Sequence, residues 1–517
     1  MDLLQEAPAR VMPPTRYEDP ARCWTLGADH PWTADEVEQA ATDPQARFQL
    51  APAVYDRLAR SREALETLKE AGTPIYGVTT GFGPFVQYGS AEAGGCAHGS
   101  GLIAHLTAGS GALAPPHVVR ATMILRTQAL THGYSAVRPE VLQAYLHLLE
   151  RNIIPAVPEI GSVGASGDLT PLAHIARVLT GEGYVLYDGE RLPARGVLRA
   201  AGIEPIELEG RDALALVNGT TFMTAYAALA VAAAERLVAR AEALTGWIYR
   251  LLGCRAQALH PRLHEARGHA GQQHSAANIR EEAARYGDWE DTTRPLQEVY
   301  SFRCAPQVLG ACRENLAYAH RIVETEMNGV SDNPLIFDGG LDGAPMIAHG
   351  GNFQGQQVGF AADALNQALV QVGVLAERQV AALLNPQLNQ EAPLLLAWNP
   401  GPQSGLAGAQ LTSTALVAEM RHHAHPCAIQ SISTNGGNQD VVSMGTMAAR
   451  QAYGQIGRLT HILAVVGIAL TQLTHLRTMG RAEGRLTPVP GWMPTVEPLE
   501  EDRGLWEDIE RVGRAWA

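Results

Sequence analysis

The tripeptide Ala165-Ser166-Gly167 could form an electrophile from the protein's own backbone. It lies in a glycine-rich loop of sequence GSVGASGDLTPL. In a tight bend the amide nitrogen of Gly167 can approach the carbonyl carbon of Ala165, because neither residue carries a large side chain. Ring closure with loss of two waters, one from the Ser166 hydroxyl, would leave an exocyclic methylene that reacts with amines. The alternative is a turn, or an anion-binding nest before a helix that Asp168 caps.

Three further side chains could carry proton transfer and anion binding. Tyr76 lies in the glycine-flanked loop YGVTTGFG and could act as a general base. A phenol normally titrates near ~10, so we expect the site to depress the pKa of Tyr76. Arg303 offers a planar fork for a carboxylate, and Tyr300 beside it could orient an amine or assist proton transfer. The alternatives are an aromatic lid for Tyr76 and a surface ion pair for Arg303.

Six segments resemble, in the same order, the histidine/phenylalanine/tyrosine ammonia-lyase family. They are the loops at 76–83 and 161–172, LALVNGT at 214–220, YSFRCAPQ at 300–307, HGGNF at 349–353 and NGGNQD at 435–440. The resemblance implies that Ala165-Ser166-Gly167 becomes a methylidene-imidazolone group, with Tyr76 and Tyr300 as catalytic residues. It also implies substrate-binding roles for Gly83, His105, Leu106, Asn218, Gln297, Arg303, Phe353, Asn435, Asn438 and Gln439.

Two positions bear on the substrate that the resemblance implies. His105-Leu106, in LIAHLTAG, occupies the pair that faces the substrate's ring and resembles the pair of tyrosine ammonia-lyases. An imidazole there can hydrogen-bond a phenolic hydroxyl, and a site built for that bond penalises a substrate without the hydroxyl. Gln439 is a neutral amide where histidine lyases have a glutamate. We therefore expect elimination of ammonia from L-tyrosine to give 4-coumarate.

Several alternatives share these motifs. A tyrosine or phenylalanine 2,3-aminomutase would return the amine to the β-carbon, which depends on loop closure and residence time. A histidine ammonia-lyase-like enzyme and a catalytically inactive helical oligomer of the same fold are the other two. The resemblance implies a homotetramer with active sites shared between chains, and neither metal nor nucleotide. The cluster His422, His423, His425 and Cys427 does not place three ligands on one helix face.

Composition excludes other classes of protein. The chain has 517 residues, a formal net charge of −14 and no basic stripe, which argues against nucleic-acid binding. The six cysteines lack a CxxC pair and are typical of reduced thiols. Residues 1–16 lack a signal-peptide pattern, and the apolar stretch 462–470 is too short to span a bilayer. We expect a cytoplasmic protein that does not enter a membrane.

The hydrophobic pattern predicts the elements that must position these residues. Helical periodicity appears at 51–71, 116–132 and 138–151, and a glycine-rich block at 72–111 predicts a functional loop. Residues 185–192 predict a β-hairpin centred on Asp188-Gly189. Long apolar helices are expected at 221–252, 356–384 and 445–476, buried on several sides. The fold class is therefore mainly α, a long-helix bundle (216–517) with a loop-rich catalytic portion (1–215).

Overall fold

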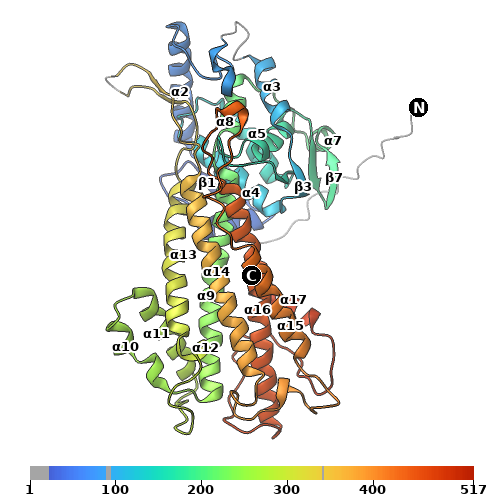
Figure 1. Ribbon diagram of the computed structural model, residues 1–517. Coiled ribbons are helices and arrows are strands. Elements are labelled where there is room, and N and C mark those ends of the chain that lie inside the picture. Colours follow the sequence, from blue (N-terminus) through green and yellow to red (C-terminus); the bar gives the residue numbers. More distant parts are fainter. Residues whose placement is uncertain (1–22, 89–94, 341–342, 517) are drawn as a thin grey trace, which may run out of the picture. The chain divides into compact units, whose positions relative to one another are not determined.

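The computed structural model describes residues 23–88, 95–340 and 343–516, coloured along the chain in Figure 1. The chain forms two compact units, each made of three separate stretches. The first unit comprises Met1–Leu229, Val323–Gly359 and Ala428–Met447, and the second comprises Ala230–Ile322, Phe360–Cys427 and Ala448–Ala517. The division after residue 215 stays a prediction. Residues 1–16, which lack a signal-peptide pattern, lie outside the described residues.

Helices dominate the described part of the chain. They are α1 Ala34–Thr42, α2 Pro52–Glu70, α3 Cys96–Leu106, α4 Pro116–Leu130, α5 Pro139–Glu150, α6 Leu169–Leu179, α7 Ala194–Ala200, α8 Gly210–Val217, α9 Thr221–Leu252, α10 Pro261–Glu265, α11 Ala270–Ala284, α12 Tyr300–Arg303, α13 Ala305–Met327, α14 Gln356–Leu383, α15 Ala407–His422, α16 Gly445–Thr478 and α17 Trp506–Arg514. The mainly α fold class is confirmed.

The strands are short and form small separate sheets. They are β1 Cys23–Leu26, β2 Arg47–Leu50, β3 Ser110–Leu113, β4 Ile154–Pro155, β5 Pro158–Ile160, β6 Tyr184–Tyr187, β7 Glu190–Pro193, β8 Leu335–Phe337 and β9 Met346–Ala348. β1 and β2 pair in parallel, whereas β3–β5, β4–β6–β7 and β8–β9 are antiparallel. The hairpin β6–β7 turns at Asp188 and Gly189, both at positive φ, as the Asp-Gly pair predicted.

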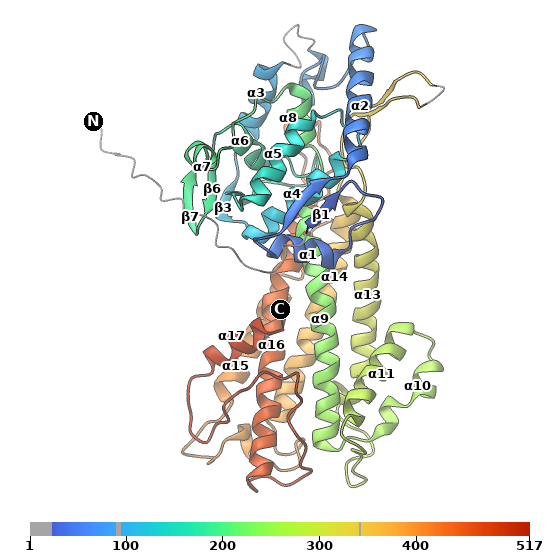
Figure 2. The same cartoon turned by 180° about the vertical axis from the view of Figure 1, so that it is seen from behind.

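Four long helices, α9, α13, α14 and α16, run alongside one another in both views (Figures 1 and 2). Three of them were predicted, and α9, α14 and α16 end within two residues of the expected positions. All residues from 221 to 234 of α9 are buried. Apolar side chains contribute to stability only where they are removed from water, so this stretch of α9 lies in the core on all of its faces.

The prediction that the apolar stretch 462–470 is too short to span a bilayer is wrong on length. It lies within α16, one of three described helices that are long and apolar enough by length and composition to cross a membrane, with α9 and α14. The most apolar windows of α9, α14 and α16 are 83%, 72% and 89% buried inside the protein. The apolar side chains of these helices are therefore used in the protein's own packing.

The glycine-rich block at 72–111 is not a loop throughout. Residues 96–106 form helix α3, which packs against α6 and α8. Gly99 permits this contact, because a Cβ there would lie 2.2 Å from the carbonyl oxygen of Leu208. The expectation of a continuous loop was wrong because this glycine serves a close helix approach rather than a turn.

Candidate active site

The tripeptide Ala165-Ser166-Gly167 adopts the tight bend that ring closure requires. Ala165 and Gly167 face each other in an isolated β-bridge, and Gly167 also pairs with Gly219. Gly167 has φ +67°, and a Cβ at this position would lie 2.1 Å from the carbonyl oxygen of Gly219. A larger residue is therefore excluded at Gly167 both by the backbone angle and by the neighbouring segment 214–220, which contains Gly219.

Two other segments hold the outer part of this loop in place. The backbone N–H of Met444 donates to the carbonyl of Val163 at 3.0 Å, and the Ser443 hydroxyl donates to the carbonyl of Gly164 at 3.1 Å. On the other side, the N–H of Asp168 donates to the carbonyl of Gly219 at 2.7 Å. The bend is thus fixed by contacts with residues that lie far away in the sequence.

Asp168 anchors the loop but does not cap the helix that follows it. It stands at the N-cap position of α6 without a side-chain capping bond. Its fully buried carboxylate instead accepts hydrogen bonds from the backbone N–H of Met223 (2.8 Å) in the first turn of α9, from the Ser162 hydroxyl (3.0 Å) and from the Thr446 hydroxyl (2.5 Å). Burial raises the pKa of Asp168 to about 6, against the opposing effect of these hydrogen bonds.

Two amide side chains hold Ser166. The Asn218 Nδ2 donates to the carbonyl oxygen of Ser166 at 3.1 Å, and the Gln439 Nε2 donates to the Ser166 hydroxyl at 3.1 Å. The Gln439 Oε1 accepts from the Thr434 hydroxyl at 2.8 Å, which fixes the amide so that its NH2 group faces Ser166. Gln439 therefore contacts the tripeptide itself. A glutamate at this position could not donate to the Ser166 hydroxyl.

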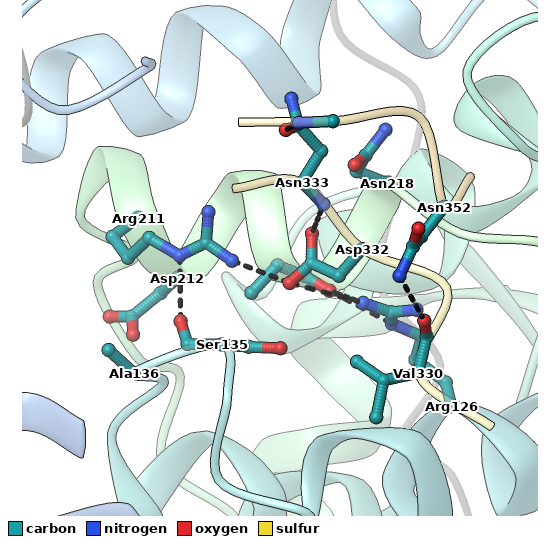
Figure 3. A network of polar contacts seen from close by, with 12 residues as sticks. Arg126, Ser135, Ala136, Arg211, Asp212, Asn218, Val330, Asp332, Asn333 and Asn352 are labelled. Atoms are coloured by element: carbon teal, nitrogen blue, oxygen red, sulfur yellow. Dashed lines mark hydrogen bonds and ion pairs between the residues drawn. The ribbon is translucent and has the colours of Figure 1, made fainter. Parts of the chain in front are cut away.

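A buried arginine network supports the segment 214–220, which carries Asn218. In Figure 3, Arg126 and Arg211 approach Asp332 from opposite sides. The Arg211 Nη2 lies 2.5 Å and the Arg126 Nη2 lies 3.9 Å from the same Asp332 Oδ2. Arg126 Nε also donates to the carbonyl of Ala215 at 2.9 Å, near the carboxyl end of α8, where carbonyls lack intrahelical partners. Two guanidinium groups thus share one carboxylate directly beside the tripeptide's support.

Tyr76 lies on the predicted loop and is held in place by both of its polar groups. Its hydroxyl accepts the backbone N–H of Gly83 at 2.7 Å, and its own N–H donates to the Nε2 of His349 at 3.1 Å. Burial raises the pKa of Tyr76, and the Gly83 hydrogen bond lowers it only in part. The expected depression of this pKa is therefore wrong for the single chain, because no cation among the described residues faces the phenol to offset its desolvation.

One cavity of about 960 Å³ in the first unit gathers most of the predicted site residues. Those that line it are Tyr76, Gly83, His105, Leu106, Ala165, Ser166, Gly167, Asn218, Phe353, Asn435, Asn438 and Gln439. The other lining residues are mostly apolar or glycine, and within the described ranges no Arg, Lys, Asp or Glu lines the cavity. The cavity is thus of a size for a small molecule, uncharged, and open to the Ser166 side chain.

His105 presents one defined nitrogen for hydrogen bonding. Its Nδ1 lies 3.0 Å from the carbonyl oxygen of Gly101, which can only accept, so the proton resides on Nδ1 in the neutral ring. The Nε2 is left as an acceptor. An acceptor at this place matches the O–H group of a phenol.

Three predicted residues do not line this cavity in the described chain. Gln297, Tyr300 and Arg303 belong to the second unit, where Arg303 lies over the ring of Tyr300 at 4.6 Å and donates to the carbonyl of Glu298 at 2.8 Å. The side chain of Tyr300 is 70% exposed. A role for these three residues in the site stays a prediction.

The structure adds lining residues that sequence reasoning missed. His98 stacks on Phe82 with ring centroids 4.1 Å apart, and both line the cavity together with Asn333. His98 and His105 are seven residues apart and lie on one face of α3. Helical spacing would have revealed His98 had residues 96–106 been recognised as a helix. Nothing in the sequence near Asn333 pointed to the site.

Comparisons with known proteins agree with this arrangement. The family model described as aromatic amino acid lyase matches residues 32–488. A tyrosine ammonia-lyase from Cupriavidus metallidurans is 42% identical over 510 residues, covering 93% of this chain and 94% of that protein. A histidine ammonia-lyase from Stigmatella aurantiaca is 40% identical over 484 residues, covering 92% and 93%. The solved structure of a tyrosine aminomutase from Streptomyces globisporus has a TM-score of 0.86 and 36% identity, covering 96% of each chain.

The match to the family model extends from the capping segment of α1 through the tripeptide loop to the end of the long helices. The relatives span nearly the whole chain, so the likeness is not confined to the loop motifs. The chain therefore belongs to the aromatic amino acid lyase family.

Proposed function

We propose that this enzyme eliminates ammonia from an aromatic L-amino acid and that L-tyrosine, giving 4-coumarate, is the preferred substrate. The observation that carries the proposal is the position of Ser166. It lies in the bent tripeptide, is held by Asn218 and Gln439, and opens into a small-molecule cavity that Tyr76 also lines.

The residues present fit a methylidene-imidazolone group formed from Ala165-Ser166-Gly167. The bend brings Ala165 and Gly167 together, and the space beside Gly167 has no room for a Cβ. Asn218 donates to the Ser166 carbonyl, while its own Oδ1 is buried with no hydrogen-bond partner among the described residues. That orphaned acceptor is available to a new donor. When formed, the group supplies an electrophile for the amine nitrogen of the substrate.

The chain's own side chains then divide the remaining tasks. Tyr76 removes a proton from the substrate's β-carbon. Phe353 and the apolar lining exclude water from the reacting atoms. His105 accepts the phenolic O–H through Nε2, which favours tyrosine over phenylalanine because phenylalanine would leave this acceptor without a partner.

The cavity lacks a cation among its described lining residues, and this lack supports a site shared between chains. The substrate carries a carboxylate, but within the described residues the cavity offers it no Arg or Lys. Arg303 beside the exposed Tyr300 has the required fork. We propose that the enzyme is a homotetramer in which copies of Tyr300 and Arg303 from neighbouring chains complete each cavity. A guanidinium near Tyr76 would also lower its pKa toward the range in which a phenol acts as a base.

Two other outcomes rest on particular relatives. The likeness to a tyrosine aminomutase supports a β-amino acid product. This product arises if the cavity retains the eliminated product long enough for the amine to return to its β-carbon. The 40% identity with a histidine ammonia-lyase supports histidine as substrate. Gln439 argues against histidine as substrate. Its amide is hydrogen-bonded to Ser166 and Thr434, and no carboxylate among the described lining residues can meet an imidazole.

A product assay distinguishes these outcomes. Purified protein is incubated separately with tyrosine, phenylalanine and histidine, and the products are identified by mass spectrometry. We expect 4-coumarate from tyrosine; urocanate as the sole product would refute the tyrosine assignment, and a β-amino acid would identify a mutase. Intact mass provides an independent measurement. Wild-type protein should be lighter than its sequence by two waters, whereas Ser166→Ala should not show this loss.

A further inference from the structure

A second cavity, of about 550 Å³, lies in the first unit away from the residues assigned a role above. Its lining comes from the turn after α3 and the strand β3, from the β4–β5 segment, from α6 and from the hairpin β6–β7. It includes Gly109, His174, Arg177, Tyr184 and Arg191. None of these residues lines the larger cavity in the described chain.

Two arginines give this cavity a positive character in an otherwise acidic protein. Arg177 is 3.2 Å from Glu182, but both side chains are partly exposed, so this pair is weak. Arg191 lies over the ring of Tyr184 at 4.3 Å, and among the described residues no carboxylate pairs with it. Glu182 is the only acidic side chain in the described lining. One guanidinium is therefore left without a counterion.

The pKa of His174 reflects its burial and the positive charge of the two arginines. Burial lowers its pKa to about 4, with further lowering by the positive charges of Arg177 and Arg191. The ring is consequently neutral near pH 7, and its Nε2 accepts the backbone N–H of Gly109 at 3.3 Å. The neutral histidine therefore holds Gly109 without adding a charge to the cavity, where Arg191 has no counterion among the described residues and Arg177 has only the weak pair with Glu182.

We propose that this cavity binds a small anion that presents a phosphate or carboxylate group to Arg177 and Arg191. Guanidinium groups bind both kinds of oxyanion through paired N–H donors. Ser110 also lines the cavity, and a serine hydroxyl can donate a hydrogen bond to an anion. The ring of Tyr184, which also lines the cavity, provides an apolar surface beside Arg191.

Residues that are adjacent in the sequence line the two cavities. Thr107 lines the second cavity and directly follows His105-Leu106, which line the first. Arg177 stands on α6, whose N-cap residue is Asp168. A bound anion would therefore restrain the segment 107–111 at the end of the helix that carries His105.

Titration calorimetry on the full-length protein tests the proposal. Inorganic phosphate and malonate are titrated separately, so that the two arms show which anion chemistry is preferred. We expect binding in the range of about 0.1–1 mM for at least one anion, and at least about a 10-fold loss in Arg177→Gln/Arg191→Gln. Arg199→Gln is the matched control, since Arg199 is exposed on the nearby α7 and does not line the cavity.

Two further measurements keep the result interpretable. The single variant Arg191→Gln removes only an exposed cation over an aromatic ring, so it should fold as the wild type does and still bind more weakly. Hydrogen exchange should show anion-dependent protection of amides 107–111. Absence of binding by both anions up to about 10 mM, or equal binding by the double variant, would overturn the proposal. Neither readout depends on which amino acid the enzyme converts.

Discussion

Replacing Asp332 by asparagine removes the one carboxylate that Arg126 and Arg211 share. The side chains of all three residues are at most 2% exposed. Breaking a buried ion pair costs about 3–5 kcal/mol, because an uncompensated charge stays out of water. The amide oxygen introduced by Asp332→Asn could still accept one hydrogen bond from Arg211, so we expect the lower end, about 3 kcal/mol less stability.

The network also supports the strip that holds Ser166, so a second effect should follow. The backbone N–H of Thr220 donates to the Ser331 hydroxyl at 3.2 Å, and Arg126 donates to the carbonyl of Ala215. Because Ser331 adjoins Asp332 and Arg126 contacts it, we expect Asp332→Asn to weaken both of these contacts near Asn218. A smaller fraction of Asp332→Asn molecules should therefore show the loss of two waters.

Urea denaturation at one fixed protein concentration, followed by tryptophan fluorescence, measures the first effect. Asp338→Asn is the matched control, because Asp338 also pairs with an arginine, Arg60 at 2.9 Å, but both side chains are exposed. That control should unfold at the wild-type midpoint. Equal midpoints for Asp332→Asn and Asp338→Asn would show that the buried network does not stabilise the fold as argued.

Three other substitutions test single features of the site. Gly167→Ala places a Cβ 2.1 Å from the carbonyl oxygen of Gly219, so the variant should retain its full sequence mass; a loss of two waters would contradict the steric argument. Burial raises the folded-state pKa of Asp168 from 3.8 to about 6, so the folded state holds a proton on this carboxyl more tightly than the unfolded state does. The contribution of Asp168 to stability therefore falls as the pH rises from about 4 to 6. Asp168→Asn should remove this part of the pH dependence in urea midpoints, and parallel pH profiles would refute it. His105→Phe should lower kcat/KM for tyrosine relative to phenylalanine by at least about 10-fold, measured by product formation, whereas an unchanged ratio would exclude the hydroxyl contact.

Much of the local structure was predictable from sequence, because it depends on neighbours in the chain. Apolar runs marked α9, α14 and α16 almost to the residue. Pro139 marked the start of α5, and Asp188-Gly189 marked the turn of β6–β7. The tripeptide and the tyrosine loop were recognisable for the same reason, since small residues at fixed spacing mark the bend and the glycine-flanked loop.

Other features depended on segments that meet only in three dimensions. Ser166 is held by Asn218 and by Gln439, which lies 273 residues further along the chain. Asp168 caps α9 rather than the helix it precedes, because the buried carboxylate meets the first turn of a helix that begins 53 positions later. No local pattern contains either contact.

The sequence therefore determined which residues could build an electrophile, which helices form the core and which family the chain resembles. Only the tertiary structure showed that burial raises the pKa of Tyr76, that residues 96–106 form a helix bringing His98 beside His105, and that the cavity, within the described residues, lacks a cation for a carboxylate. The physical reason is that hydrophobic periodicity and turn chemistry act between neighbours in the chain. Desolvation and charge depend on every group that packs around a site, whatever its distance in sequence.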